Sequence, residues 1–202
     1  MARHIRQQPV RETIALVGDG HTERYYFSDI IDNDRPRNFH IKPDYPRRIG
    51  SFQGALARAI ELTTSYTHVF ALIDMDKILD EKKMPAYRIA KEQAIQTGVT
   101  VLENNPCFEI WILLHFVTTG KPFTKCQDVV SEIKKMQGLA DYDKSEKYFR
   151  SAKLYSRFKS KIISAAIPNS RILEKDRDDK TERYPRAELF KFFEWYFNRA
   201  KT

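Results

Sequence analysis

Acidic side chains follow two apolar runs in this sequence, at spacings that would suit a metal ion or an acid–base reaction. Asp19 stands between two glycines in the stretch GDGHTE, and Glu23 comes four residues later. Asp74 and Asp76 end the stretch FALIDMD with a single residue between them. Carboxylates held this close together repel each other and raise one another's pKa unless a cation lies among them. The pattern therefore predicts a bound cation.

A third apolar run leads into the stretch ENNPCFE, which supplies Glu103 and Glu109. Carboxylate oxygens are the ligands that Mg²⁺ and Mn²⁺ prefer, so we expect one of these ions to be bound. The predicted metal ligands are Asp19, Glu23, Asp74, Asp76 and Glu109. Two alternatives stay open, because aspartates also cap loops and a glutamate at the start of a helix also offsets the helix dipole.

These acids need a scaffold that brings distant segments together, and the hydrophobic pattern of the first half predicts one. Apolar runs typical of β-strands alternate with the spacing of amphipathic helices. We expect strands at 12–17, 38–43, 68–73 and 99–103, and helices at 22–32, 51–66 and 85–98. Thr22 or His21 is the expected cap of the first helix, and Ser51 that of the second. The alternation predicts an α/β fold with a Rossmann-like core, in which a four-stranded, mostly parallel sheet is flanked by helices.

In an open parallel sheet, ligands bind beyond the carboxyl ends of the strands. If the first, third and fourth strands are neighbours, at least three carboxylates meet at one edge of the sheet, and Glu103 is a candidate to join them. Asp74 and Asp76 would face the same way if their strand continued through both. Gly20 would allow a left-handed or tight turn, where the following helix also favours a phosphate. An ordinary strand-to-helix turn is the alternative interpretation of this glycine.

After residue 105 the pattern changes to helices alone. We expect helices within 107–117, 125–137, 144–166 and 186–200. Charges of both signs replace apolar residues over 171–186, so we expect an exposed loop there. The predicted organisation is an α/β core over residues 1–105, with a helical, basic region over residues 106–202 packed on it.

The chain carries a net charge of +8, which favours polyanionic partners through the release of counterions. Residues 121–161 hold eleven Lys or Arg against five Asp or Glu, with aromatic residues between them. Nucleic acid is therefore the expected partner, and its predicted contacts are Lys125, Lys144, Lys147, Arg150, Lys153 and Arg157. The alternative is a solvated helical face whose aromatic side chains belong to the core.

The sequence argues against secretion, membrane insertion and a cysteine framework. Residues 1–17 carry charges on both sides of a short apolar segment, unlike a signal peptide. The longest apolar segment, CFEIWILLHFV, is about half as long as a membrane-spanning helix. Cys107 and Cys126 form no C-x-x-C pair, so we expect two free, half-buried thiols in a cytoplasmic protein, and neither a disulfide nor a structural zinc site.

Three stretches together resemble the RloB-like family, a branch of the Toprim domains: LVGDGHTERYYF, FALIDMDK and NNPCFEIWILLHF. They occur in the family's order and spacing and cover most of the first 117 residues. The resemblance implies a Toprim core and a metal-dependent nuclease. It also implies catalytic roles for Asp19, Asp74 and Asp76, and metal-binding roles for Glu23 and Glu109. The family usually has glutamate at the position of Asp19, so this chain keeps the charge on a side chain one methylene shorter.

Downstream, the stretch DYDK resembles a short Tyr-x-Lys element of the same family. It implies that Lys144 acts against the negative charge that develops during phosphodiester hydrolysis, while Mg²⁺ or Mn²⁺ activates water. Family members act in bacterial defence, often beside an ABC-type ATPase partner. A noncatalytic nucleic-acid-binding or regulatory subunit with a degenerate site is the alternative function.

Overall fold

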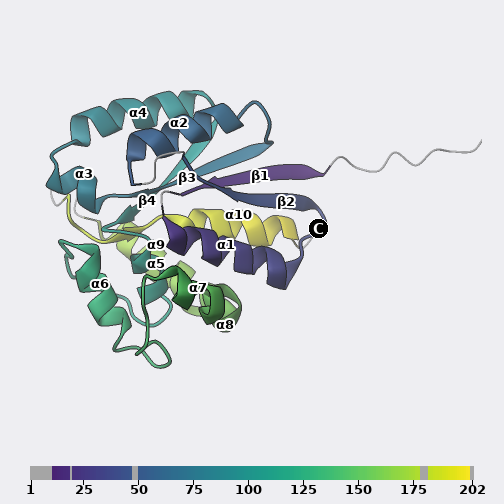
Figure 1. Cartoon of the computed structure of the whole chain (residues 1–202). Helices are drawn as coiled ribbons and strands as arrows, with labels where there is room; N and C mark the ends of the chain where they lie inside the picture. Colours follow the sequence, from purple (N-terminus) through teal and green to yellow (C-terminus); the bar gives the residue numbers. More distant parts are fainter. Residues whose placement is uncertain (1–10, 19, 47–49, 178–181, 201–202) are drawn as a thin grey trace, which may run out of the picture.

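The computed structural model describes residues 11–18, 20–46, 50–177 and 182–200, and it has an α/β fold (Figure 1). Five strands form one sheet in the order β2-β1-β3-β4-β5. They are β1 (Glu12–Val17), β2 (Phe39–Asp44), β3 (His68–Asp74), β4 (Val99–Asn105) and β5 (Arg186–Ala187). The first four are parallel, and β5 runs antiparallel to β4. The predicted α/β fold is confirmed, but the prediction of four strands missed β5, whose two residues are too few to show an alternating pattern.

The register of the strands decides which side chains meet at the edge of the sheet. Val17 of β1 pairs with Ala71 of β3, and Asp74 of β3 pairs with Asn104 of β4. β1, β3 and β4 are therefore neighbours, as the predicted site required. Their carboxyl ends open onto the same edge, where the loops that carry the acids begin.

One face of the sheet is covered by α2 (Phe52–Leu62) and α4 (Met84–Gln96), which lie side by side in Figure 1. Their apolar sides pack on alternate strand residues, among them Val17 and Ala71. Ser51 caps α2 as predicted, because its hydroxyl accepts a hydrogen bond from the N–H of Gly54 (3.4 Å). Leu72 packs in the cluster on the opposite face, and strand side chains alternate, so Asp74 lies on that opposite face too.

The opposite face is covered by α1 (His21–Asp34) and α10 (Leu189–Ala200) (Figure 1). Residues from both halves of the chain share one aromatic cluster here, among them Tyr26, Trp111 and Phe193. The rings of Trp111 and Phe193 stack with their centroids 5.1 Å apart. The indole N–H of Trp111 donates a 2.9 Å hydrogen bond to the hydroxyl of Tyr26 on α1. The C-terminal half is thus built into the same core as the sheet. The division into two regions at residue 105 stays a prediction.

The remaining helices are α3 (Asp76–Asp80), α5 (Glu109–Leu113), α6 (Cys126–Ile133), α7 (Glu146–Ala152), α8 (Leu154–Lys161) and α9 (Ile167–Lys175), with a π-helical turn over Ile162–Ala166. Among the described residues, no helix is both long and apolar enough to cross a membrane. The expected loop over 171–186 is wrong in part, because α9 continues to Lys175. Its Leu173 is buried in the core, and that packing outweighs the charged residues around it.

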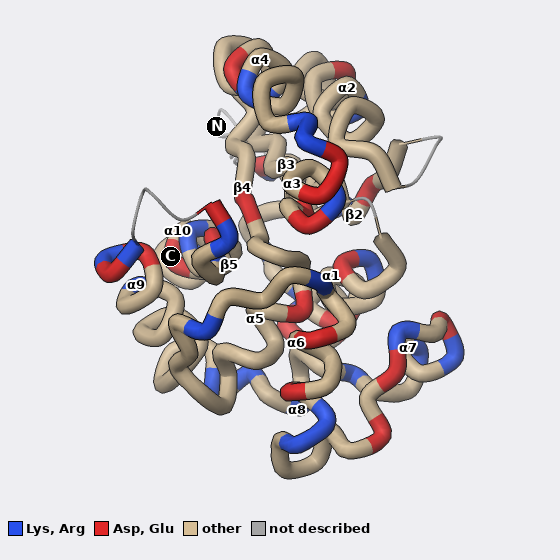
Figure 2. Tube along the Cα trace, turned by 90° about the vertical axis from the view of Figure 1, so that its left-hand side faces the viewer, with Lys and Arg blue, Asp and Glu red and all other residues tan. Residues whose placement is uncertain are grey.

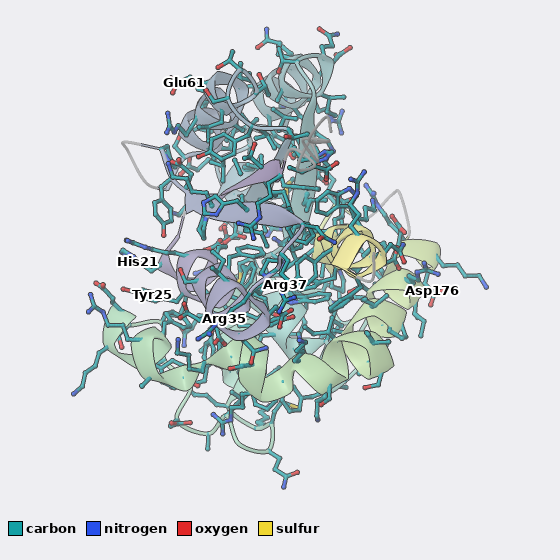
Figure 3. The ribbon with its side chains drawn as sticks, turned by 90° about the vertical axis from the view of Figure 1, so that its right-hand side faces the viewer. His21, Tyr25, Arg35, Arg37, Glu61 and Asp176 are labelled. Carbon is teal, nitrogen blue, oxygen red and sulfur yellow. A yellow bond between two sulfur atoms is a disulfide. The ribbon has the colours of Figure 1, made fainter. Side chains whose placement is uncertain are left out.

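Polar contacts reinforce the packing of α1 on the C-terminal helices. The carboxylate of Asp34 accepts hydrogen bonds from the hydroxyls of Tyr155 (2.5 Å) and Tyr196 (2.7 Å). Nearer the start of α1, the hydroxyl of Tyr25, labelled in Figure 3, donates to Glu146 of α7. These contacts hold α1, and the acid in its first turn, in a fixed position against the second half of the chain.

Candidate metal-binding active site

Asp74 and Asp76 lie where β3 ends. After Asp74 the N–H of Met75 is shared between the carbonyl oxygens of Asn104 (3.0 Å) and Pro106 (2.9 Å), and the N–H of Asp76 donates to Pro106 (2.9 Å). Asp74 accepts a 2.8 Å hydrogen bond from the N–H of Phe108, and Asp76 begins α3. The two aspartates are therefore not alternate residues of one continuing strand. Both nevertheless line the same cavity, which has a volume of about 360 Å³.

Glu109 is the first residue of α5, and only 1% of it is exposed. Its Oε1 accepts hydrogen bonds from the hydroxyls of Thr22 (3.1 Å) and Tyr142 (3.3 Å), and lies 3.0 Å from the Nζ of Lys144. Burial, and then the negative charge of Glu109, raise the pKa of Tyr142 well above its ordinary value. The phenol therefore stays protonated and donates. An interaction with the helix dipole alone would not account for these three partners.

Glu23 lies in the first turn of α1 and is 4% exposed. A Cβ at Gly20 would lie 2.7 Å from the Oε2 of Glu23, and a Cβ at Gly18 would lie 3.1 Å from the Cβ of Glu23. A side chain at either glycine would therefore press on the side chain of Glu23. Gly20 has a φ of −138°, which is extended backbone, so of the left-handed and tight conformations considered for it the left-handed one is not adopted. Gly20 is also the N-cap of α1, so the predicted caps Thr22 and His21 are wrong.

Lys144 supplies the positive charge near which three of these carboxylates meet. Burial alone would lower the pKa of Lys144, but the negative charges of Glu109, Asp74 and Glu23 outweigh burial and raise the pKa above its ordinary value. The side chain is 45% exposed and lines the same cavity as Asp74 and Asp76. The negative charges of acids from α1, β3 and α5 thus act on one ammonium group, and Lys77 and Lys83 line the same cavity.

The donor atoms of this site are of the kind that a magnesium or manganese ion prefers, but no three of the described carboxylates bring their oxygens within 4.8 Å of one another. The carboxylates of Glu23, Asp74, Asp76 and Glu109 offer only oxygen ligands, which these ions prefer. Asn104, beside Asp74 in the sheet, is fully buried, and neither polar atom of its side chain has a hydrogen-bond partner among the described residues. A buried amide without partners is costly, and its oxygen is a further ligand of the right type. Asp19 lies outside the described residues, so its predicted role stays a prediction.

Glu103 does not join these acids, and the expectation that it could is wrong. Its carboxylate accepts a 2.8 Å hydrogen bond from the hydroxyl of Tyr87 and lies 2.6 Å from the Nζ of Lys91, both on α4. It also pairs with Arg186 of β5. Successive strand residues face opposite sides of a sheet, so Glu103 and Asn104 point to different faces.

Lys144 is the member of the predicted nucleic-acid-binding set that lines the cavity. The other members are exposed on or beside α6, α7 and α8: Lys125, Lys147, Arg150, Lys153 and Arg157. Arg150 pairs with Glu146 (2.7 Å) and Lys153 with Asp32 (3.0 Å), and charges of both signs alternate along α7 (Figure 2). The aromatic residues nearby belong to the core, as the alternative interpretation expected, since Tyr142 and Tyr155 are fully buried.

The expectation of two free thiols is wrong, because Cys107 and Cys126 form a disulfide with Cα atoms 5.6 Å apart. The two residues are 19 positions apart in the sequence, which gives no local pattern to recognise. The Sγ of Cys126 lies 3.0 Å from the Oε2 of Glu109 and 3.3 Å from the Nζ of Lys144. Cys126 also lines the cavity, so the disulfide forms part of its wall.

Sequence reasoning missed the roles of three residues at this site: Thr22, Tyr142 and Cys126. Thr22 was interpreted as a helix cap, although its place directly before Glu23 ties it to the acid. Tyr142 stands two residues before Lys144, and that spacing was the available signal for a shared role. For Cys126 the sequence held no such signal.

Comparison with known proteins identifies a single family. The family model described as RloB-like protein matches residues 14–194, which is most of the chain. Neither a curated protein nor a solved structure matches the chain.

Proposed function

The chain belongs to the RloB-like protein family, and we propose that it is a metal-dependent nuclease that hydrolyses phosphodiester bonds of nucleic acid. The observation that carries the proposal is a cavity lined by Asp74, Asp76 and Lys144, with the buried carboxylate of Glu109 3.0 Å from the Nζ of Lys144. A divalent cation would bind the carboxylate oxygens of these side chains, which are ligands of the type that Mg²⁺ and Mn²⁺ prefer. The family match supports the proposal because it spans all four residues.

The side chains that would hold Mg²⁺ or Mn²⁺ are Glu23, Asp74, Asp76 and Glu109. When bound, such an ion lowers the pKa of water and neutralises charge on the phosphate. Asp74 is oriented by the N–H of Phe108, and Glu109 by the hydroxyls of Thr22 and Tyr142. These hydrogen bonds hold the carboxylates in position, as a preorganised site requires.

Lys144 would stabilise the negative charge that develops on the phosphate during hydrolysis. Its raised pKa keeps the side chain protonated at neutral pH. Because the side chain is 45% exposed, its ammonium group can turn from Glu109 toward a phosphate in the cavity. Asp19 would accept a proton from the attacking water or add a further metal ligand.

The proposed substrate is nucleic acid, either RNA such as tRNA or DNA. The net charge of +8 supports a polyanionic substrate, since each phosphate neutralised by Lys or Arg releases counterions. The proposal also includes a cytoplasmic role in bacterial defence and an ABC-type ATPase partner, which the family resemblance implies.

Cleavage assays test this function directly. Purified protein would be incubated with total tRNA, single-stranded DNA and duplex DNA, with Mg²⁺, with Mn²⁺ and with a chelator. We expect cleavage of at least one substrate that depends on the metal and is lost in Asp76→Asn and Glu109→Gln. Glu61→Gln is the matched control, because Glu61 is an exposed residue of α2 that pairs with Arg58 outside the site (labelled in Figure 3). Cleavage that survives the chelator, or that both site variants retain, would overturn the proposal.

A second function is a noncatalytic nucleic-acid-binding subunit with a degenerate site. One observation favours it, which is that Thr22, Tyr142 and Lys144 already satisfy Oε1 of Glu109. Measurements with Asp74→Asn separate the two functions. The nuclease predicts lost cleavage with nucleic-acid affinity largely kept, whereas the noncatalytic subunit predicts that the wild-type chain binds nucleic acid but no divalent metal.

A further inference from the structure

The two cysteines and Glu109 form a cluster that the proposed hydrolysis does not use. Their ligand atoms, the two sulfurs and one carboxylate oxygen, all lie within 4.8 Å of one another. Cys107 is buried beneath the cavity, and Cys126 lines it. A disulfide is one state of this pair, and two thiols are the other.

In the reduced state the cluster has the donors of a zinc site. Zinc prefers thiolate sulfur over an all-oxygen set and accepts a carboxylate as a third ligand, with water in the fourth position. Tetrahedral Zn–S bonds of ~2.3 Å place two sulfurs ~3.8 Å apart. Rotation of the side chains reaches this separation without backbone movement, because the Cα atoms of Cys107 and Cys126 are 5.6 Å apart.

The charges of the cluster also suit a divalent cation. Two thiolates and Glu109 would carry three negative charges, which a Zn²⁺ ion and the ammonium group of Lys144 balance. The Nζ of Lys144 lies 3.3 Å from the Sγ of Cys126 and 3.0 Å from Glu109. Its side chain is 45% exposed, so it can move outward when an ion enters.

We propose that Cys107, Cys126 and Glu109 form a redox-dependent zinc site at the wall of the cavity. A dithiol reductant supplies two electrons and two protons to the Cys107–Cys126 bond, and is itself oxidised to a disulfide. Zinc then replaces the two thiol protons, which are released to solvent. Oxidation and zinc binding exclude each other, because both use the same two sulfurs. If the proposed nuclease function holds, zinc also withdraws Glu109 from the magnesium site and inhibits cleavage.

Zinc binding by the purified protein tests this site without nucleic acid, so the result does not depend on nuclease activity. The wild-type chain would be prepared reduced and oxidised, with thiols counted by a chromogenic disulfide reagent. Zinc stoichiometry would be measured by competition with a chromogenic chelator, and Co²⁺ would report sulfur ligation through its thiolate charge-transfer band. The oxidised wild-type chain is the control for folding, since it has the same sequence.

We expect one zinc ion per reduced chain and none at this site in the oxidised chain. Cys107→Ser and Cys126→Ser should each weaken zinc binding by at least ~10-fold, and Glu109→Gln should weaken it while keeping the charge-transfer band of Co²⁺. The proposal is overturned if the reduced chain binds no zinc. It is also overturned if the oxidised chain, or the chain with both cysteines replaced by serine, binds zinc as tightly as the reduced wild type.

Discussion

Two buried carboxylates flank the end of β4, and their surroundings differ in charge. The Glu103 cluster (Glu103, Tyr87, Lys91, Arg186, Glu188 and Lys191) contains two acids and three cations, and the N–H of Glu103 donates to Glu188 (2.9 Å). The Glu109 cluster (Glu23, Asp74, Glu109, Tyr142 and Lys144) contains three acids and the cation Lys144, and Lys77 and Lys83 line the adjoining cavity. Burial does not distinguish them, because Glu103 is 4% exposed and Glu109 is 1% exposed.

The charges of the Glu103 and Glu109 clusters differ although their burial does not. Charge balance, more than burial, therefore separates a structural cluster from a ligand site. In the Glu103 cluster each carboxylate has a cation of the chain, so the group is complete without a ligand. In the Glu109 cluster the negative charges of three acids act on the ammonium group of Lys144, and a bound cation would lower the repulsion between these acids. The two clusters should therefore respond in opposite ways to the loss of a negative charge.

The largest effect is expected in the Glu103 cluster. Glu103→Gln leaves Lys91 and Arg186 without their shared partner in partly buried surroundings. We expect the free energy of unfolding, measured with a denaturant, to fall by about 3 kcal/mol. Cleavage per folded molecule should stay at the wild-type level, because Glu103 faces away from the site. A fall below about 1 kcal/mol would show that the cluster is not held by its charges.

In the Glu109 cluster the same kind of substitution should affect activity instead. Asp74→Asn keeps an oxygen that can accept from the N–H of Phe108, and removes only the charge. We expect the cleavage rate to fall about 100-fold or more, equivalent to about 2.7 kcal/mol of transition-state stabilisation. The free energy of unfolding should change by less than about 1 kcal/mol, since repulsion with Glu109 and Glu23 is relieved. A stable variant with the wild-type cleavage rate would contradict the role given to Asp74.

The next prediction concerns Lys144, the cation of the Glu109 cluster, and its loss should strengthen metal binding. Lys144→Met deletes the cation that competes with a metal for the three carboxylates. A unit charge about 4 Å away contributes about 1 kcal/mol even at the dielectric constant of water, so we expect Mn²⁺ to bind roughly fivefold more tightly. Cleavage should nevertheless be slower, because the charge that develops on the phosphate loses its partner. Calorimetric titration and a cleavage assay give the two values, and weaker Mn²⁺ binding would contradict this account.

Asp34 extends the comparison to a third, well-paired carboxylate. Burial would raise the pKa of Asp34, but hydrogen bonds from Lys159, Tyr155 and Tyr196 lower it below its ordinary value. A lowered pKa means that the stabilisation is present above the pKa of the unfolded chain and is lost as the pH falls through that of the folded chain. We expect Asp34→Asn to be less stable than the wild type by about 1 kcal/mol at pH 7, and this gap to close below about pH 4.

Denaturant unfolding of the wild type and of Asp34→Asn at several pH values measures the gap between their free energies of unfolding. A gap that stays constant from neutral to acid pH would mean that the contribution of Asp34 does not depend on its charge.

The sequence predicted the scaffold of the site because the relevant patterns are local. Each of the strands β1, β3 and β4 shows an apolar run of its own, and acids follow directly. Asp74 lies against the segment that carries Glu109, since it accepts from the N–H of Phe108, which agrees with the general rule that ligands bind at the carboxyl ends of parallel strands.

The remaining features depend on contacts between residues far apart in the chain. Thr22 and Glu109 are 87 residues apart, and no local pattern couples them. The pairing of Cys107 with Cys126 depends on where α6 begins relative to α5. Glu103 was misplaced for a different reason, because the face to which a strand residue points requires the register as well as the sequence.

Mn²⁺ binding to the wild type and two variants tests the central claim most directly, because it compares the two clusters without requiring a substrate. Calorimetric titration of the wild-type chain, Asp74→Asn and Glu103→Gln would be carried out under identical conditions, with the disulfide intact. We predict that the wild type and Glu103→Gln bind Mn²⁺ with the same affinity, and that Asp74→Asn binds at least ~10-fold more weakly. Equal affinities of all three proteins, or no binding by the wild type, would contradict the account.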